Sequence, residues 1–384
     1  MTGKLQVQND KLTVRKEIPL FSLRLTDEEI SRVVEVLQSG KLREGPVCRA
    51  FEEKFASLVG ANFAISVSSG TAALHVAYAA ALSPGDEVLV PSFTFIATAS
   101  MVSMVGAKPV FCDVDPNTFT LDPDDAAKRI TPRTKAIAPV HLFGNPCNIE
   151  KIINLAQKYN LKIIWDAAQA HGAKYQKQDI GSFDDLVCYS FYPSKNMTTG
   201  EGGMITTNDQ SLYQKCKLLR SHGQSGKYYH TLLGFNYRLT DFMAALGIEQ
   251  LKNLLENVRR RRENARYLSE QFSDISIFQL PKEQPEGESS YNLYSILLNL
   301  NKMNVSRDKF LELLKEERIT AQVHYPRPLH KQPVFEKDAA DISLPISEDL
   351  SQRIFSLPVH PLLTQEDLEF IVKGMKKVVK QALN

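Results

Sequence analysis

Residues 189–203 read Tyr-Ser-Phe-Tyr-Pro-Ser-Lys-Asn-Met-Thr-Thr-Gly-Glu-Gly-Gly, and Lys195 is the only lysine among them. Apolar runs at 186–189 and 204–207 flank this stretch and predict two buried strands. A lysine between buried strands is unusual, because lysine is seldom fully buried unless it has a partner or a function. Loss of hydration lowers the pKa of an amine and makes it available for Schiff-base formation. The alternative is an ordinary surface lysine in a hairpin loop, and this stretch is compatible with both.

The composition is that of a globular protein with enough material for two domains. The chain has 384 residues, of which 43% are hydrophobic and 23% charged. Its net charge of +2 gives no strong field for nucleic acid or a membrane. The one basic cluster, Arg259–Arg262, lies in a helical pattern that also carries Glu256 and Glu263, which predicts a solvated or subunit-facing helix face. We therefore expect no nucleic-acid partner.

The cysteines, histidines and apolar runs indicate where the protein works. The five cysteines are scattered and form no Cys-x-x-Cys pair, which is typical of reduced thiols in a cytoplasmic protein. The eight histidines show no zinc-ligand spacing, so no metal site is expected. No apolar run approaches about 18 residues, so we also expect no membrane span.

Strand and helix patterns alternate along the first half of the chain. Apolar runs at 63–67, 87–90, 108–112, 135–140 and 161–165 predict strands, with helical spacing between several of them. This alternation predicts an α/β fold whose mostly parallel sheet is covered by helices on both faces. Ligands of such sheets bind beyond the carboxyl ends of the strands.

The chain divides into three predicted parts. Residues 1–16 form a polar N-terminal tail, residues 17–250 a large domain, and residues 251–384 a smaller C-terminal α/β domain. A helical pattern from about residue 240 to residue 272 is long enough to connect the two domains.

Four polar or aromatic features follow predicted strands. Residues 68–71, Ser-Ser-Gly-Thr, begin a helix whose free N–H groups and hydroxyls could hold a phosphate. Phe95 follows another strand and could stack on a flat ring. Asp166 ends an apolar strand before a run of small residues, so its carboxylate needs a cationic partner such as a protonated pyridine nitrogen. Gln169 and His171 lie near enough to add polar contacts to the same ring. Ser190 and Lys195 complete the set.

Each feature also has a simpler explanation. Ser-Gly-Thr is an ordinary start for a helix, Phe95 could be a core residue, and Asp166 could merely cap the next helix. The combination is more specific than its parts. An acid and then a lysine on successive strands, after a phosphate cradle, is the order expected of an enzyme that uses pyridoxal 5′-phosphate (PLP). The acid would keep the pyridine ring protonated, and the lysine would hold the aldehyde and move protons.

The chain resembles the DegT/DnrJ/EryC1/StrS aminotransferases from about Ile18 to its C-terminus. These are fold-type I PLP enzymes, and they mostly act on keto groups of nucleotide-linked sugars. The matching stretches, besides the lysine loop, are residues 40–46, 69–75, 84–88, 91–99, 166–172, 222–223, 236–240 and 324–330. Trp165 stands where many relatives have a glutamate, which should not alter the chemistry. The resemblance implies a large PLP-binding domain and a smaller C-terminal α/β domain.

The resemblance also implies roles for single residues. Lys195 forms the Schiff base with the cofactor, and Asp166 pairs with the pyridine nitrogen. Gln169 contacts the ring or its phenolic oxygen, and Phe95 stacks on the ring. The phosphate contacts that it implies are those of Gly70, Thr71 and Ser190.

Further implied contacts concern the second subunit and the substrate. Asn236 reaches the phosphate of the neighbouring subunit's cofactor, which implies an isologous homodimer with shared active sites. The candidate substrate contacts are His324, Tyr325, Arg327 and Arg238. His324 and also His330 could equally be loop packing residues.

Three functions are compatible with this pattern. The first is an aminotransferase that moves an amino group from L-glutamate or glutamine to a keto-sugar, nucleotide-linked as for most of the family, in amino-sugar biosynthesis. The second is a PLP-dependent sugar dehydratase of the same family. The third is a non-enzymatic regulator on the same fold. Lys195 favours the first over dehydratases that carry histidine there, and the intact set of Lys195, Asp166 and Ser190 speaks against a regulator.

Overall fold

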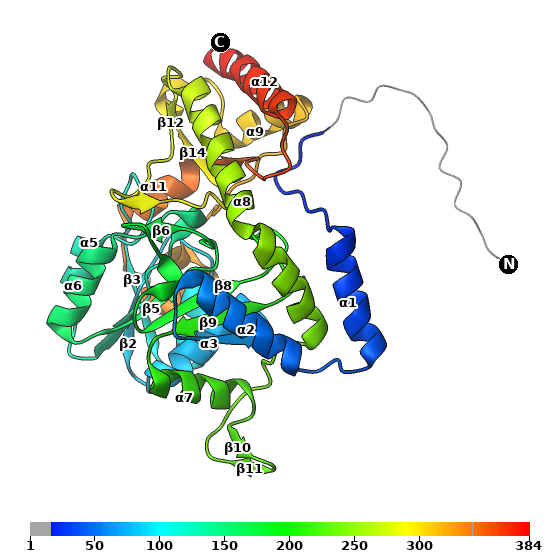
Figure 1. The fold of residues 1–384 in the computed structure, drawn as a ribbon. Helices are drawn as coiled ribbons and strands as arrows, with labels where there is room; N and C mark the ends of the chain where they lie inside the picture. The colour runs from blue at the N-terminus through cyan, green and yellow to red at the C-terminus, as the bar shows by residue number, and fades with distance from the viewer. Residues whose placement is uncertain (1–16, 340) are drawn as a thin grey trace.

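The computed structural model describes residues 17–339 and 341–384, and the predicted tail at 1–16 lies outside the described residues (Figure 1). A seven-stranded sheet forms the centre of the larger part of the molecule. Its strands, in spatial order, are β1 (Phe63–Val67), β9 (Gly203–Thr207), β8 (Leu186–Ser190), β5 (Lys162–Asp166), β4 (Thr134–Ile137), β2 (Glu87–Pro91) and β3 (Lys108–Cys112).

The sheet is mostly parallel, as predicted. The pairs β8–β5, β5–β4, β4–β2 and β2–β3 are parallel. Only β9 runs against its two neighbours, β1 and β8. The parallel strands are connected by helices, because a parallel pair needs a crossover connection. The carboxyl ends of β5 and β8, and therefore Asp166 and Ser190, meet at one edge of the sheet.

Helices cover both faces of the sheet. One face packs on α2 (Pro46–Val59), α6 (Ile149–Tyr159) and the first part of α8 (Asp241–Phe272). The other face packs on α3 (Gly70–Ala81), α4 (Ala97–Met104) and α7 (Gln210–Arg220). Along β5, Ile163 and Trp165 face the first layer and Ile164 faces the second. Because side chains alternate along a strand, Asp166 points to the side of α3 and α4.

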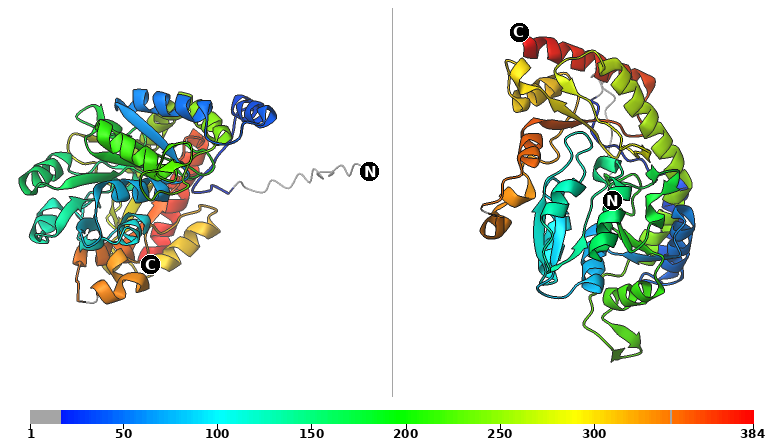
Figure 2. Two further views of the ribbon diagram at one scale, coloured as in Figure 1. Left: turned by 90° about the horizontal axis from the view of Figure 1, so that it is seen from below. Right: turned by 90° about the vertical axis from the view of Figure 1, so that its left-hand side faces the viewer.

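Helix α8 joins the two parts of the molecule, as its length predicted. It begins after Thr240 and continues for 32 residues. Its second half packs into a separate core with β14 (Tyr294–Leu298), β15 (Ile354–Leu357), α9 (Arg307–Glu316) and α12 (Gln365–Leu383) (Figure 2). Ile18, at the start of the described chain, also packs in this core. The division at residue 250 falls inside α8 and stays a prediction.

The remaining elements are helix α1 and a set of shorter helices and strands. α1 (Asp27–Ser39) lies against α8, and a hairpin of β10 (Gln224–Gly226) and β11 (Tyr229–His230) projects away from the sheet (Figure 1). The others are α5 (Pro123–Lys128), β6 (Lys174–Tyr175), β7 (Gln178–Asp179), β12 (Phe278–Gln279), β13 (Gly287–Glu288), α10 (Glu336–Ala339) and α11 (Pro345–Arg353). None of the helices in the described parts of the chain is both long and apolar enough to cross a bilayer.

The prediction of a solvated basic face on α8 is wrong for one residue. Arg259 and Arg260 are exposed and pair with Glu256, as expected. Arg261 is buried, and its guanidinium donates to the carbonyls of Tyr291 and Asn292, both at 3.3 Å. The reason is geometric, since four consecutive residues span a full helical turn and one of them must face the core. Burial lowers the pKa of Arg261 to about 10.

Candidate active site

A cavity of about 690 Å³ lies at the carboxyl ends of the central strands. Segments that follow β1, β2, β5 and β8 line it, together with residues 292–293 and 324–325 from the C-terminal part of the chain. Nine residues that the sequence predicted for the cofactor or the substrate line this cavity: Gly70, Thr71, Phe95, Asp166, Gln169, Ser190, Lys195, His324 and Tyr325. The fold thus brings together, at one site, residues that lie up to 255 positions apart in the sequence (Gly70 and Tyr325).

Asp166 is a buried carboxylate held by two hydrogen bonds. Its Oδ2 accepts from Thr98 Oγ1 at 2.8 Å, and its Oδ1 accepts from the Ala168 N–H at 3.1 Å. Burial raises the pKa of Asp166, while these two bonds and the charge of Lys195 oppose the rise. Within the described residues, no basic side chain comes into ion-pairing distance of this carboxylate. The Asp166 carboxylate would therefore form an ion pair with a cation that enters the cavity.

Lys195 lies in the loop between β8 and β9, next to the end of β5. Its backbone N–H donates to the Tyr192 carbonyl at 2.9 Å, which forms a turn. Loss of hydration lowers the pKa of Lys195 to about 8, with Asp166 acting in the opposite direction. The residue keeps part of its surface open to the cavity. At pH 7 about a tenth of such an amine is neutral and nucleophilic, far more than of an ordinary lysine.

The sequence analysis missed the two asparagines that hold the lysine loop. Asn196 Nδ2 lies 3.3 Å from the His171 carbonyl and 3.2 Å from the Ser290 carbonyl. Asn292 Nδ2 donates to the Ser194 carbonyl at 2.9 Å. Asn196 could have been suspected because it follows the lysine directly. Asn292 is almost 100 positions away and has no local signal.

The N-terminus of α3 forms a cradle against Ser190. Ser69 caps the helix, since its Oγ accepts from the Ala72 N–H at 3.0 Å. A Cβ atom at Gly70 would lie 2.6 Å from Ser190 Cβ, so only glycine allows this close approach. The Thr71 and Ser190 hydroxyls therefore lie beside a helix N-terminus, where free N–H groups attract anions.

Gln169 and the aromatic residues form a wall of the cavity. Gln169 Oε1 accepts from the Phe143 N–H at 2.7 Å, and its Nε2 donates to the Tyr325 hydroxyl at 3.0 Å. Phe95 is 54% exposed, which a core phenylalanine would not be. Its ring centroid lies 6.3 Å from that of Tyr325. One face of a flat ligand could therefore lie against Phe95.

The two histidines differ. His324 lines the cavity, and its Nδ1 is buried without a hydrogen-bond partner among the described residues. Burial, with a contribution from Lys195, lowers its pKa to about 4. His330 does not line the cavity, and its ring is hydrogen-bonded to Ser92 and Glu348. The packing role that the sequence left open therefore fits His330 better than His324.

His171 also lies outside the cavity lining, since its ring is buried against those of Tyr189 and Phe191. Three further predicted residues lie outside the lining, and all of these roles stay predictions. Asn236 is exposed and pairs through its backbone with Ser221. Arg238 pairs through its backbone with Val67 at the end of β1. Arg327 is exposed, and its Nη1 lies 3.5 Å from the Lys331 carbonyl. Lining residues that the sequence analysis did not single out include Thr94, Tyr192 and Glu201.

This geometry agrees with comparisons with known proteins. The model of the DegT/DnrJ/EryC1/StrS aminotransferase family matches residues 24–376. The chain belongs to this family. A UDP-N-acetyl-3-dehydro-alpha-D-glucosamine 3-aminotransferase from Acidithiobacillus ferrooxidans is 37% identical over 375 residues, and the match covers 96% of this chain and 100% of that protein.

Two solved structures extend the comparison to the cofactor. S. venezuelae DesV, in complex with a ketimine intermediate, has a TM-score of 0.88 and 34% identity, and the match covers 92% of this chain and 94% of that one. NtdA from Bacillus subtilis, with the cofactor PMP bound, has a TM-score of 0.86 and 31% identity over 93% of this chain and 83% of that one. The protein is a PLP-dependent aminotransferase with the α/β architecture of fold-type I.

The residues of the cavity fit PLP in chemical type. The α3 N-terminus suits a phosphate, and the glycine at position 70 lets Ser190 lie directly against it. A protonated pyridine nitrogen would supply the positive charge that suits the buried Asp166 carboxylate. Lys195 offers the amine for the aldehyde.

Proposed function

We propose that this aminotransferase transfers an amino group from L-glutamate or L-glutamine to a keto group of a nucleotide-linked sugar, as a step of amino-sugar biosynthesis. The observation that carries the proposal is the placement of Lys195 and Asp166 in one cavity of about 690 Å³. This volume is within the usual range for small-molecule sites and leaves room for a large acceptor. The UDP-sugar named for the Acidithiobacillus relative supports the class of acceptor.

The residues of the cavity divide the work. Bound PLP supplies the carbonyl that takes up the amino group and a ring that accepts electrons. The N-terminus of α3 with Thr71 and Ser190 binds the phosphate. Asp166 holds a proton on the pyridine nitrogen, and Phe95 covers one face of the ring. Lys195 Nζ moves the proton at the reacting carbon, because its lowered pKa suits both acceptance and release.

Gln169 and His324 complete the site in this proposal. Gln169 has its amide orientation set by the Phe143 N–H, so its Nε2 points to the Tyr325 hydroxyl. The contact of Gln169 with the ring or its phenolic oxygen is the role that the family resemblance implies. His324 lines the cavity and contacts the sugar acceptor in this proposal.

We also propose that the active form is a homodimer with shared sites. Lys195 is the only side chain among the described lining residues that is basic near neutral pH, since the pKa of His324 is about 4. A cofactor phosphate and a nucleotide diphosphate carry several negative charges, which a single lysine does not balance. The β10–β11 hairpin projects from the body of the protein (Figures 1 and 2), and Leu233, just after it, is 97% exposed. Such a segment is placed to enter a second copy.

The catalytic part of the proposal is tested with the purified protein reconstituted with PLP. L-glutamate should convert the visible absorbance of bound PLP to that of the aminated form, and a UDP- or GDP-linked keto-sugar should restore it. Lys195→Ala should abolish both conversions, while Lys174→Ala serves as a lysine control in a strand outside the cavity. A wild-type protein that ignores both donors, or a Lys195→Ala variant with full turnover, would sink the assignment. Loss of a sugar hydroxyl without amination would indicate the dehydratase instead.

The shared site is tested by mixing two inactive variants. Lys195→Ala and Asn236→Asp each spoil a different half of the proposed site, so a hybrid dimer should contain one intact site. Mixed and re-equilibrated subunits should regain up to about a quarter of the activity, since random pairing gives half hybrids with one site of two. No recovery from variants that exchange subunits would contradict the shared site.

A further inference from the structure

Two walls of the cavity come from segments that are far apart in the sequence. Thr94 and Phe95 follow β2, whereas His324 and Tyr325 belong to the C-terminal part of the chain. Their aromatic rings touch, with the Tyr325 centroid 6.1 Å from that of Phe93 and 6.3 Å from that of Phe95. Ring contacts alone restrain distance weakly, so the relative position of these walls depends on what lies behind them.

Behind the rings, Ser92 joins the two segments by three hydrogen bonds. The Leu329 N–H donates to the Ser92 carbonyl at 2.7 Å, and the His330 N–H donates to Ser92 Oγ at 3.2 Å. Ser92 Oγ also lies 2.6 Å from His330 Nδ1. Both side chains are almost completely buried. Breaking these hydrogen bonds would leave buried polar groups unsatisfied, and this energetic cost stabilises the contact between the two segments.

The hydrogen-bond roles determine the tautomer of His330. The ionised carboxylate of Glu348 can only accept, so His330 Nε2, 3.0 Å from Glu348 Oε1, carries a proton and donates it. In a neutral ring Nδ1 is then an acceptor, so the Ser92 hydroxyl donates to Nδ1 while its oxygen accepts from the His330 backbone N–H. Burial lowers the pKa of His330, which agrees with the neutral ring. The chain of bonds from Ser92 to Glu348 is therefore complete without a charged histidine.

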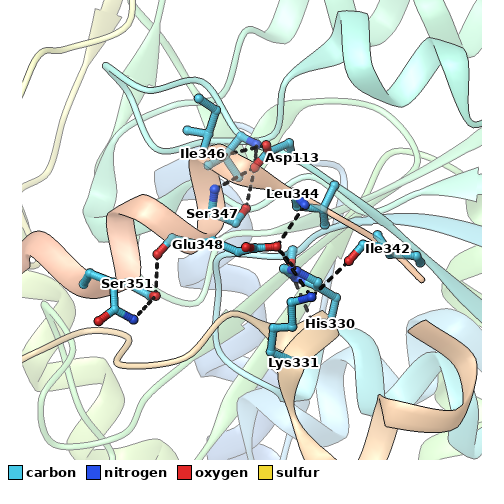
Figure 3. A network of polar contacts seen from close by, with 12 residues as sticks. Asp113, His330, Lys331, Ile342, Leu344, Ile346, Ser347, Glu348 and Ser351 are labelled. Carbon is cyan, nitrogen blue, oxygen red and sulfur yellow. Dashed lines mark hydrogen bonds and ion pairs between the residues drawn. The ribbon is translucent and has the colours of Figure 1, made fainter. Parts of the chain in front are cut away.

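Glu348 carries the connection to α11. The same Oε1 accepts from the Leu344 N–H at 3.2 Å, just before α11 begins. Asp113, which follows β3, accepts from the backbone N–H groups of Ile346 at 2.9 Å and Ser347 at 2.8 Å (Figure 3). The start of α11 is thus tied to the central sheet at Asp113 and to the cavity walls through Glu348.

Ser92, His330 and Glu348 have the order of a hydrolase triad, but they cannot act as one. Ser92 is fully buried and does not line the cavity of the site. Its hydroxyl oxygen is also occupied by the His330 backbone N–H. A nucleophilic serine must be reached by its substrate. The three residues therefore have a structural role and not a catalytic one.

We propose that Ser92, His330 and Glu348 form a brace that sets the spacing between the Phe95 wall and the His324–Tyr325 wall, and that His330 is a positioning residue for the bound cofactor. The brace rests on the proposed function only in taking this cavity as the PLP site. Its role is to hold Phe95 at ring-stacking distance and the Tyr325 hydroxyl against Gln169. Without it, the cavity still forms, but its walls separate and grip a flat ring less firmly.

The test uses the PLP-reconstituted enzyme and three carboxylate variants on α11. Glu348→Ala removes the outer end of the brace, and Glu348→Gln keeps an acceptor oxygen there. Asp349→Ala is the matched control, because within residues 17–339 and 341–384 Asp349 forms an ion pair only with Arg353, on the same helix. We expect about a tenfold weaker PLP affinity and a reduced visible circular dichroism of bound PLP for Glu348→Ala. Glu348→Gln should recover most of both signals, and Asp349→Ala should match the wild type.

The outcomes separate the brace from a merely structural role. If Glu348→Ala is folded and binds PLP with wild-type affinity and circular dichroism, the proposal is overturned, even if its melting temperature falls. If Glu348→Ala does not fold, Ser92→Ala, which removes one hydroxyl, decides the question by the same two readouts. Lys195→Ala is measured in parallel. If that variant also leaves the PLP signals unchanged, the cavity assignment has failed rather than the brace.

Discussion

Replacing Thr98 by valine tests how the protein keeps Asp166 ionised. Thr98 Oγ1 donates to Asp166 Oδ2 at 2.8 Å, and valine has almost the same shape without the hydroxyl. A hydrogen bond to a charged group contributes about 1.5–3 kcal/mol, and one pKa unit corresponds to about 1.4 kcal/mol. Because the lost bond favours the carboxylate, the pKa of Asp166 in the apo protein should rise by a further one to two units, roughly.

PLP binding reports this shift. Binding of a protonated pyridine nitrogen requires the ionised carboxylate, so PLP affinity falls about tenfold for each pH unit below the pKa of Asp166 in the apo protein. Absorbance titrations across a pH series should place the start of this fall about one to two units higher in Thr98→Val than in the wild type.

A matched control separates this effect from general destabilisation. Thr206→Val removes an equally buried hydroxyl, whose Oγ1 donates to the Gly181 carbonyl at 2.8 Å away from the cavity. This variant should melt at a lower temperature but show the wild-type pH dependence. Coinciding pH profiles for Thr98→Val and the wild type would refute the reasoning about Asp166.

Three further variants or conditions probe the same site. Burial raises the pKa of Asp166, so its favourable contribution to apo stability is present at low pH and is lost as pH rises through the folded pKa. Asp166→Asn should therefore melt higher than the wild type without PLP at pH 7 and bind PLP poorly; a lower apo melting temperature would contradict this. The pKa of Lys195 is about 8, so the rate of Schiff-base formation with PLP, followed by stopped-flow absorbance, should rise with pH and level off above about 8. A flat profile would argue against Lys195 as the nucleophile. Gly70→Ala places a Cβ 2.6 Å from Ser190 Cβ and 3.0 Å from its Oγ, which costs about 1–3 kcal/mol. Calorimetry should show weaker binding of both PLP and inorganic phosphate, and unchanged phosphate binding would exclude this cradle.

Residues with a signal in their own segment could be predicted. Lys195 and Asp166 could be predicted because each lies at or after the end of an apolar strand, and ligands bind at the carboxyl ends of parallel strands. Asn292 and Thr98 could not be predicted, because their roles depend on partners 98 and 68 positions away.

The sequence by itself determined the α/β class, the family and the residues that we propose to hold the cofactor, because these depend on local periodicity and on short motifs at strand ends. Only the tertiary structure decided which of several residues of the same type is buried, exposed or directed to the cavity. It buried Arg261 beside exposed Arg259 and Arg260, and it turned His324 to the cavity while His330 braces Ser92 and Glu348. The physical reason is that burial and hydrogen-bond partners are set by packing between distant segments, which no local pattern specifies.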